Sequence, residues 1–277
     1  MLAATLLFAL VNVCIKKLED LPPLEIIFFR ALISLALAGI VMLWRRQPAW
    51  PDDRKTTLLW RGLAGTTALV LDFFLLRTLD LAPAVTLQYL SPIFTAIMAI
   101  FVVGEKVRPW QWVFFAVSFA GVAVGQGVGG ISWQAALLGV SAAFFSGLSY
   151  TFIRRLKDGM PALTIIFWFQ AVTLPVAAVW CLFDWETPRG LAEWGWLLAV
   201  GGLTHAGLWC ITRSYQLEQA ASAAALNYLG VLYAAVFGYW FFGETIAPQL
   251  YAGLGLVLLG VALNSWYTSR QAAKDTN

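Results

Sequence analysis

Apolar runs long enough to cross a bilayer follow one another along almost the whole chain. An α-helix needs about 20 predominantly apolar residues to span the hydrocarbon core. Hydrophobic residues make up 60% of the chain and charged residues 12%, whereas soluble domains are typically about 45–50% apolar and about 25% charged. The chain has too little polar surface to fold with water as its main solvent. We therefore expect an all-α polytopic membrane protein.

Polar and proline-bearing segments separate these runs. WRRQPAWPDDRK (44–55), RRLKDGMP (154–161) and DWETPRG (184–190) combine charges with turn-forming residues that hydrocarbon does not accommodate. The first run is short for a span, which agrees with a native N-terminus longer than this chain. The breaks predict ten transmembrane spans, over residues 1–18, 23–43, 57–78, 82–103, 108–128, 134–154, 161–184, 192–213, 221–242 and 247–267.

The distribution of Lys and Arg predicts the orientation of these spans. With the N-terminus in the cytoplasm, 13 of the 18 Lys and Arg fall in inside segments and 4 in outside loops, which is the bias that short cytoplasmic loops show. Arg61 and Arg154 are counted among the inside residues, and Arg30 lies within the second span. We therefore expect both termini to be cytoplasmic, in a cell inner membrane.

One sequence motif occurs twice in the chain. QYLSPIFTAIMAIFVVGEK (88–106) and NYLGVLYAAVFGYWFFGET (227–245) keep Tyr-Leu and Gly-Glu in register at an offset of 139 residues. The two copies fall in the fourth and ninth spans, and an odd number of crossings between them reverses their direction. We therefore expect two inverted five-helix repeats, 1–130 and 131–267, followed by a cytoplasmic tail at 268–277. Inverted repeats are a common plan of secondary transporters.

Three motifs in this order resemble a known family. FFRALI (28–33), LAPAVTLQYLSPIFTAIMAIFVVGEK (81–106) and AASAAALNYLGVLYAAVFGYWFFGET (220–245) are similar to segments of the drug/metabolite transporter superfamily, and most of all to its EamA-type exporters. The resemblance implies ten helices, cytoplasmic termini and export of small metabolites, as in aromatic amino acid and threonine/homoserine exporters. The superfamily also contains sugar-phosphate and nucleotide-sugar carriers, so the fold does not specify the substrate.

Three ionisable residues fall inside predicted spans, where charge is costly and usually faces a cavity or a partner. Arg30 and Asp72 lie at similar depths in the second and third spans, so we expect an ion pair or a gate; alternatively, Arg30 holds a substrate carboxylate or reaches the interface. His205, the only histidine, lies among small residues in the eighth span. It either bonds a neighbouring helix or lines the cavity, where it could carry a coupling proton.

The repeat supplies a second set of candidates. Gln88 and Tyr89 in the fourth span correspond to Asn227 and Tyr228 in the ninth. Pro92 interrupts the first helix and Gly230 weakens the second, and paired interruptions point to a transport site at the repeat interface. We expect the four polar residues to line the pathway, with Pro92 and Gly230 as hinges; the alternative is polar contact between helices.

Aromatic residues give weaker candidates. Most of the 14 tryptophans lie near predicted span ends, as in an interfacial belt. Trp168 and Trp209 lie further in and, with Tyr150, could form an aromatic wall for a flat or apolar substrate. Asn12 in the first span is a further candidate for the pathway lining. Glu105 and Glu244, at matched helix ends, are predicted to be structural.

The remaining features narrow the function. The chain has no phosphate-binding G-x-x-x-x-G-K-[ST] motif, no paired catalytic carboxylates within spans and no metal-ligand spacing. We expect no enzyme activity, no cofactor and no metal. The partners expected are a small-molecule substrate and the lipid bilayer, with no nucleic acid; a monomer is sufficient. The favoured substrate is an amino acid, and the alternatives are a nucleoside, a sugar phosphate or a lipid precursor.

Overall fold

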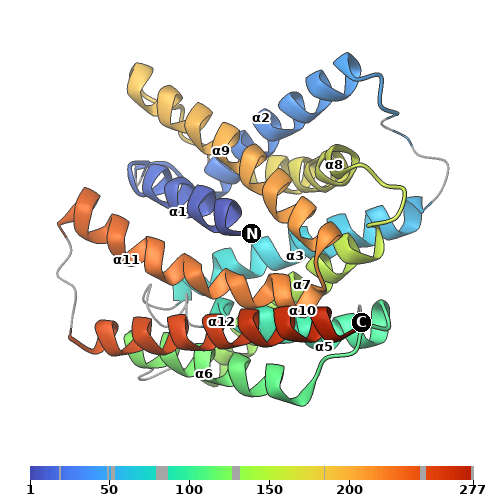
Figure 1. Cartoon of the computed structure of the whole chain (residues 1–277). Coiled ribbons are helices and arrows are strands. Elements are labelled where there is room, and N and C mark those ends of the chain that lie inside the picture. The colour runs from blue at the N-terminus through green and yellow to red at the C-terminus, as the bar shows by residue number, and fades with distance from the viewer. Residues whose placement is uncertain are drawn as a thin grey trace.

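A computed structural model describes residues 1–18, 20–48, 50, 54–78, 87–126, 132–183, 185–243 and 248–275. Helices are the regular structure throughout these residues, as the apolar runs predict (Figure 1). The helices are α1 (Leu2–Lys16), α2 (Pro23–Trp44), α3 (Lys55–Thr78), α5 (Ser91–Val102), α6 (Pro109–Gln126), α7 (Trp133–Arg155), α8 (Ala162–Cys181), α9 (Gly190–Leu217), α10 (Ala220–Ala225), the 3₁₀ turn η1 (Leu226–Tyr228), α11 (Leu229–Phe242) and α12 (Pro248–Asp275).

Each of the ten predicted spans overlaps a helix of the described chain. Within the described residues, five helical segments are long and apolar enough to cross a membrane by themselves: α2, α7, α8, α9 and the run from α10 to α11. The first part of the fourth span lies outside the described residues. α12 continues as helix to Asp275, so the predicted tail begins within this helix, and its cytoplasmic location stays a prediction.

The surface of the bundle is apolar where lipid would cover it. Large side chains that a soluble protein would bury are exposed here, including Leu43, Phe101, Leu191 and Trp240. Exposed apolar area on this scale marks a membrane or interaction surface. The polar residues that are buried therefore need an explanation from function or from helix packing.

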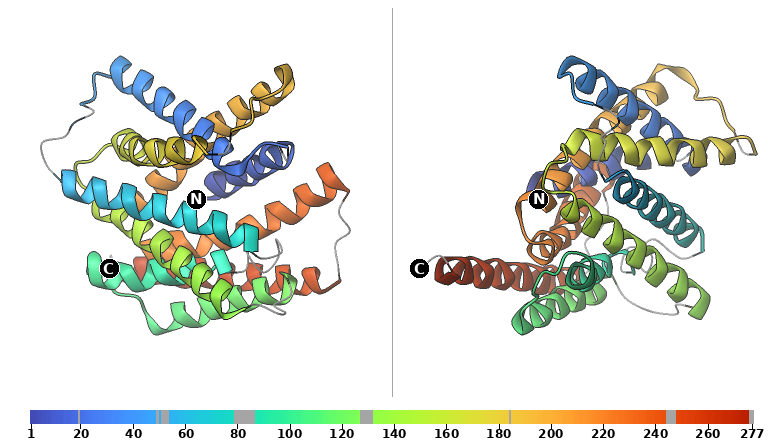
Figure 2. Two further views of the ribbon diagram at one scale, coloured as in Figure 1. Left: turned by 180° about the vertical axis from the view of Figure 1, so that it is seen from behind. Right: turned by 90° about the vertical axis from the view of Figure 1, so that its right-hand side faces the viewer.

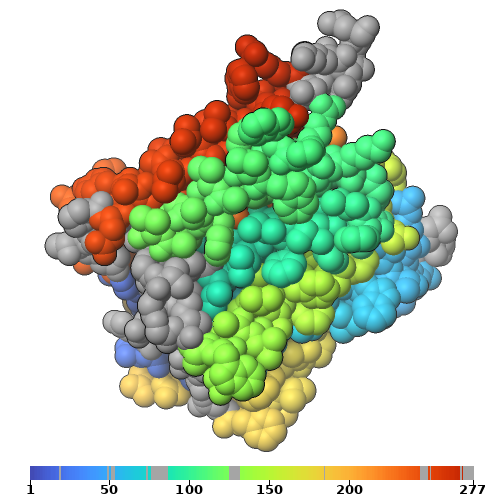
Figure 3. All heavy atoms as spheres, turned by 90° about the horizontal axis from the view of Figure 1, so that it is seen from below, coloured from blue at the N-terminus to red at the C-terminus, as the bar shows by residue number. Residues whose placement is uncertain are grey.

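Helices from the two halves of the chain pack against one another. Figures 1 and 2 show α12 lying along α6, and the view in Figure 3 shows the same two helices as adjacent bands. The other extensive pairs are α3 with α7, α1 with α9, and α2 with α8.

These pairs follow a symmetric pattern. Moving five spans along the chain converts the pair α3 and α7 into α9 and α1, and converts α5 and α7 into α11 and α1. The pairs α2 with α8, and α6 with α12, convert into themselves. Such exchange supports the two five-helix repeats, whose boundary near residue 130 lies outside the described residues and stays a prediction.

Glycine allows the closest contacts between helices. A Cβ atom at Gly121 of α6 would lie 2.6 Å from the carbonyl oxygen of Gly253 in α12. A Cβ at Gly147 of α7 would lie 2.7 Å from the backbone nitrogen of Thr95 in α5. Small residues of this kind let helix backbones approach within a membrane, where packing rather than water drives association.

We predict that Gly121→Ala destabilises the α6–α12 contact by about 1–3 kcal/mol, the usual cost of overpacking. Gly255→Ala on α12 is the control, because nothing lies within 4 Å of its Cβ position. Unfolding of the purified protein in mixed micelles, followed by tryptophan fluorescence, measures both variants. Equal stability of the two variants would show that Gly121 does not lie in a close contact between α6 and α12.

Candidate functional site

Two helices are broken at corresponding positions of the repeat. The ninth span runs as α10, then the 3₁₀ turn Leu226–Tyr228, then α11. In the fourth span, Tyr89 and Leu90 form a turn before α5 begins at Ser91. The 139-residue offset of the repeat aligns Tyr89 with Tyr228, so the two breaks share this position. Discontinuous helices in matching positions of two repeats mark the substrate sites of many transporters.

Side chains from the two breaks meet across the repeat interface. The rings of Tyr89 and Tyr228 are stacked, with centroids 5.8 Å apart and an interplanar angle of 20°. The Tyr89 hydroxyl lies against Gly230, where a Cβ would be 2.8 Å from its oxygen. Pro92 lies in the first turn of α5, where its missing N–H leaves no helical bond unmade. Gly230 thus provides space for Tyr89, and both hinge assignments stay predictions.

A polar cluster lies beside the break in the ninth span. The buried Tyr215 of α9 stacks on Tyr150 of α7 at 5.0 Å and 14°. Asn227 donates through Nδ2 to the Tyr215 hydroxyl at 3.2 Å, and the same hydroxyl bonds the side chain of Thr95 in α5. The sequence prediction includes Tyr150 and Asn227 but misses Tyr215, which has no polar neighbour in the sequence to mark it.

Arg61 is not a solvated inside charge, as the orientation count takes it to be. The structure buries it in α3 with 2% of its surface exposed, and the orientation itself stays a prediction. Its guanidinium lies over the ring of Phe169 at 4.0 Å. Nε and Nη1 have no hydrogen-bond partner among the described residues. Arg154, counted in the same way, is also buried.

The expected ion pair between Arg30 and Asp72 is absent from the described part of the chain. Nε of Arg30 and Oδ1 of Asp72 are buried without a hydrogen bond. Asp72 instead bonds the side chain of Gln88. Both charged groups, together with Arg61, interact electrostatically with Tyr150. Equal depth in sequential spans predicts proximity, but it does not specify which side chain each group faces.

His205 bonds a neighbouring helix. Its Nδ1 lies 3.3 Å from the hydroxyl of Ser34 in α2, and Ser34 is one helical turn from Arg30 on the same face. Gly201 of α9 lies against Ile33, which brings α2 and α9 close enough for this contact. His205 is half-buried, and a role in the pathway stays a prediction.

The predicted aromatic wall does not form as expected. Trp209 is 45% exposed and lies about 120° round α9 from Tyr215, away from the polar cluster. Trp168 packs against the exposed Trp50, with ring centroids 4.7 Å apart and the rings tilted by 45°. Asn12 is exposed on α1. The aromatic surface beside the cluster is instead formed by Tyr150 and Tyr215, because their ring stack places both in the interior.

A network of charged and backbone groups closes the bundle near the end of α5. Glu105 forms an ion pair with Arg154 Nε at 2.5 Å and accepts the Ala220 N–H at the start of α10 at 2.8 Å. Arg154 also donates to the carbonyl of Gln216 at 2.9 Å. Glu105 therefore caps a helix of the other half rather than its own next helix. Glu244, the matching residue, lies outside the described residues.

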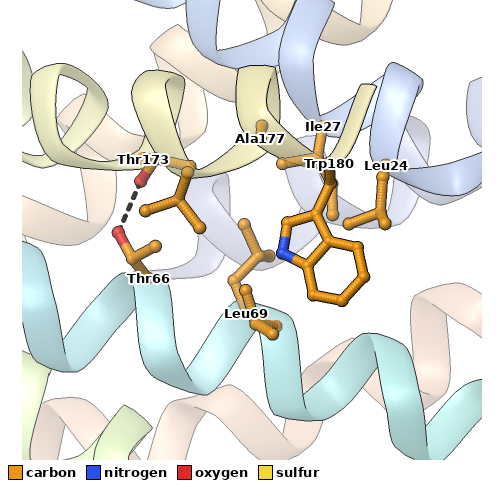
Figure 4. Close-up of a pocket in the computed structure, with 9 residues that line it drawn as sticks. Leu24, Ile27, Thr66, Leu69, Thr173, Ala177 and Trp180 are labelled. Atoms are coloured by element: carbon orange, nitrogen blue, oxygen red, sulfur yellow. Dashed lines mark hydrogen bonds between the residues drawn. The ribbon is translucent and has the colours of Figure 1, made fainter. Parts of the chain in front are cut away.

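An apolar pocket lies between α2, α3 and α8, as Figure 4 shows. Leu24, Leu69 and Trp180 are among its lining residues, and a 2.9 Å hydrogen bond between Thr66 and Thr173 lies at its edge. No charged side chain lines it, and its two hydroxyls, on Thr66 and Thr173, bond each other, so it offers little to orient a charged substrate. The polar groups around Tyr150 are the stronger candidate site.

Comparison with known proteins agrees with this geometry. Residues 1–124 and 133–266 match the EamA-like transporter family. The chain belongs to the EamA-like transporter family. A crystal structure matches it with a TM-score of 0.85 over 98% of this chain and 96% of its own, at 19% identity, which supports the fold. This EamA-like protein is therefore a multi-pass membrane transporter of small metabolites and not an enzyme.

Relatives of this EamA-like protein differ in the substrates for which they are named. The pseudopaline exporter CntI of Pseudomonas aeruginosa PAO1 is 30% identical over 264 residues, covering 94% of this chain and 91% of the relative. Human solute carrier family 35 member G1 is 25% identical over 97% of this chain and 79% of its own length. The riboflavin transporter of Vibrio cholerae is 24% identical over 88% and 73%. The family resemblance is confirmed, whereas the comparisons do not single out amino acids.

We predict that Gly230→Ala destabilises the protein by about 1–3 kcal/mol through contact with the Tyr89 hydroxyl. Adding Tyr89→Phe should restore most of this stability, because the next ring atom lies 3.9 Å from the Cβ position. Denaturant unfolding of the two single variants and the double variant measures the coupling. Additive losses, with no rescue, would show that the contact does not control this site.

We also predict that Glu105→Gln lowers the thermal stability of the protein, because it leaves the Arg154 guanidinium without its countercharge. Loss of a hydrogen bond to a charged group costs about 1.5–3 kcal/mol. Glu218→Gln is the matched control, since Glu218 is exposed nearby in the chain. Thermal unfolding of both purified variants is the measurement. An equal drop in the unfolding midpoint temperature of both variants would show that the ion pair of Glu105 with Arg154 does not stabilise this end of the bundle.

Proposed function

We propose that this chain exports small carboxylate-bearing metabolites, with amino acids among them, across a bacterial inner membrane by alternating access. In this proposal the two inverted five-helix repeats move against each other and both termini are cytoplasmic. Alternating access then exposes a site at the repeat interface to each side in turn.

The observation that carries the proposal is the meeting of both helix breaks with buried charge. The breaks at Tyr89–Leu90 and Leu226–Tyr228 lie beside a cluster in which Arg30, Arg61 and Asp72 all interact with Tyr150. Buried ionisable residues in a membrane usually serve a substrate or an ion. All these groups belong to one chain, so a monomer is sufficient for this mechanism.

The residues predicted from the sequence take specific roles here. Gln88 bonds Asp72 and orients it, and Asn227 fixes the Tyr215 hydroxyl. Tyr89 and Tyr228 hold the two breaks together. His205 links α9 to the α2 face that carries Arg30. We assign Gln88, Tyr89 and Asn227 to the pathway, and Tyr228, which is fully buried, to its support.

The test is counterflow of labelled amino acids, both aromatic and small, into liposomes that contain the purified protein. We predict saturable exchange that falls at least about tenfold in Gln88→Ala, the loss expected from removing about 1.4 kcal/mol of binding. His205→Ala should lower it as well. Gln134→Ala is the matched control, because Gln134 is exposed in the first turn of α7.

Exchange that is unchanged in Gln88→Ala would contradict the proposed site. If folded protein exchanges no amino acid, the substrate should be sought among nucleosides, sugar phosphates and lipid precursors. The family assignment would stand in either case.

A further inference from the structure

Glu105 joins three separate parts of the chain at one end of the bundle. Its Oε1 accepts a hydrogen bond from Nε of Arg154 near the end of α7, and its Oε2 accepts the backbone N–H of Ala220 at the start of α10 at 2.8 Å. Only 12% of the Glu105 side chain and 9% of the Arg154 side chain are exposed. Solvent screens this ion pair weakly, so it is stronger than a pair on an open surface.

Arg154 extends this contact to the neighbouring helix ends. Its Nη1 donates to the carbonyl of Gln216 in the last turn of α9 at 2.9 Å. The Gln216 side chain donates through Nε2 to the carbonyl of Met160, just before α8, at 2.8 Å. The ends of α7 and α9 are thereby connected to the start of α10 through the same two charged side chains.

α10 is the segment that these bonds hold in place. It has six residues and is followed at once by the 3₁₀ turn Leu226–Tyr228, where the ninth span is broken. So short a helix has few internal hydrogen bonds, and an acceptor for its first N–H contributes much of its order. Release of Glu105 would therefore leave α10 free to turn about the break.

A basic contact of related design lies at the opposite end of the bundle. The 139-residue offset aligns Arg155, the last residue of α7, with Lys16, the last residue of α1. Nζ of Lys16 lies 4.1 Å from the centroid of the Phe242 ring at the end of α11, and Nζ of Lys17 lies 5.1 Å from it. At each end, basic residues on the first helix of one repeat therefore meet the end of the fourth helix of the other repeat.

We propose that Glu105 is a positioning residue for transport, and that its bonds to Arg154 and α10 form an inner latch that alternates with an outer latch of Lys16 and Lys17 on Phe242. The inference rests on the alternating-access function proposed above and names the contacts that control it. The inner latch breaks when the Glu105 end opens, while the outer latch stays closed. The outer latch breaks when the other end opens, while the inner latch stays closed.

A purely structural role for these residues gives a different expectation. Loss of an ordinary stabilising contact loosens the bundle as a whole, so buried side chains at both ends become accessible together. Loss of one latch opens one end only, because the contacts at the other end still hold. The difference can be measured at two buried positions, one behind each latch.

Thr212 and Cys14 report the two ends separately. Thr212 lies one turn before Gln216 on the same face of α9 and is fully buried. Cys14 lies in the last turn of α1, two residues before Lys16, and is 6% exposed. A hydrophilic maleimide is added to the purified full chain carrying Thr212→Cys, in detergent. Mass spectrometry of the peptides then gives the labelling rate at each cysteine.

We expect Glu105→Gln to raise the labelling rate of the Thr212→Cys reporter at least about tenfold, the size that loss of a hydrogen bond to a charged group predicts. The rate at Cys14 should not rise. The double variant Lys16→Gln, Lys17→Gln should do the reverse, raising the rate at Cys14 at least about twofold, since cation–π contacts at exposed sites are weak. The Thr212→Cys reporter should not respond to this double variant.

Two further variants complete the test. Arg154→Gln removes the same ion pair from its other side and serves if Glu105→Gln does not fold. Glu218→Gln is the matched control, because Glu218 is exposed next to α9, and it should change neither rate. Equal increases at both cysteines in any variant would show general loosening of the bundle and would overturn the inference. An unchanged rate at the Thr212→Cys reporter in folded Glu105→Gln or Arg154→Gln would overturn it as well.

The labelling needs no substrate, so its result is separate from that of the counterflow experiment. Labelling that distinguishes the two ends, without amino acid counterflow, would keep the latches and reject amino acids as the substrate. Counterflow that is unaffected by Glu105→Gln, with unchanged labelling at both cysteines, would keep the transport function and reject the latches.

Discussion

The arrangement of this protein depends on the need to satisfy every backbone hydrogen bond away from water. In hydrocarbon an open N–H or C=O costs several kcal/mol, so broken helices survive only where protein or an internal cavity surrounds them. The breaks at Tyr89–Leu90 and Leu226–Tyr228 must therefore lie inside the bundle. Intact helices such as α2 and α8 have no such need and present exposed apolar side chains at their ends. The central position of the site follows from the backbone before any side chain is considered.

An ion pair and a helix cap near the end of α5 join the two halves of the chain. Glu105 comes from the first half, whereas Arg154 and the N–H of Ala220 come from the second. In the alternating-access proposal, opening this end would separate a partly buried ion pair and uncap α10 in one movement.

Sequence patterns predicted the class and the ten spans, because apolar length and loop composition are properties of the chain itself. The repeat offset indicated the region of both helix breaks, but the predicted interruptions at Pro92 and Gly230 lie a few residues beyond the turns at Tyr89–Leu90 and Leu226–Tyr228. These patterns failed for residues whose environment depends on the direction in which the side chain points. Arg61 stands near the start of a span and resembles a loop charge, yet Gly65 leaves room for it to turn inward along α3. Trp209 lies deep in its span but on the outward face of α9. The described residues show no ion pair between Arg30 and Asp72 for the same reason, since depth gives the level of a group and not its partner.

The unpaired guanidiniums also bear on how the carrier cycles. A transporter that returns empty must pass through an occluded state in which water has left the site. Nε of Arg30 and both Nε and Nη1 of Arg61 have no hydrogen-bond partner among the described residues, so that state would leave these groups poorly solvated. Desolvation costs several kcal/mol per uncompensated ion, and a bound anion removes much of that cost. In the alternating-access proposal, this charge distribution would favour passage of the loaded carrier over the empty one.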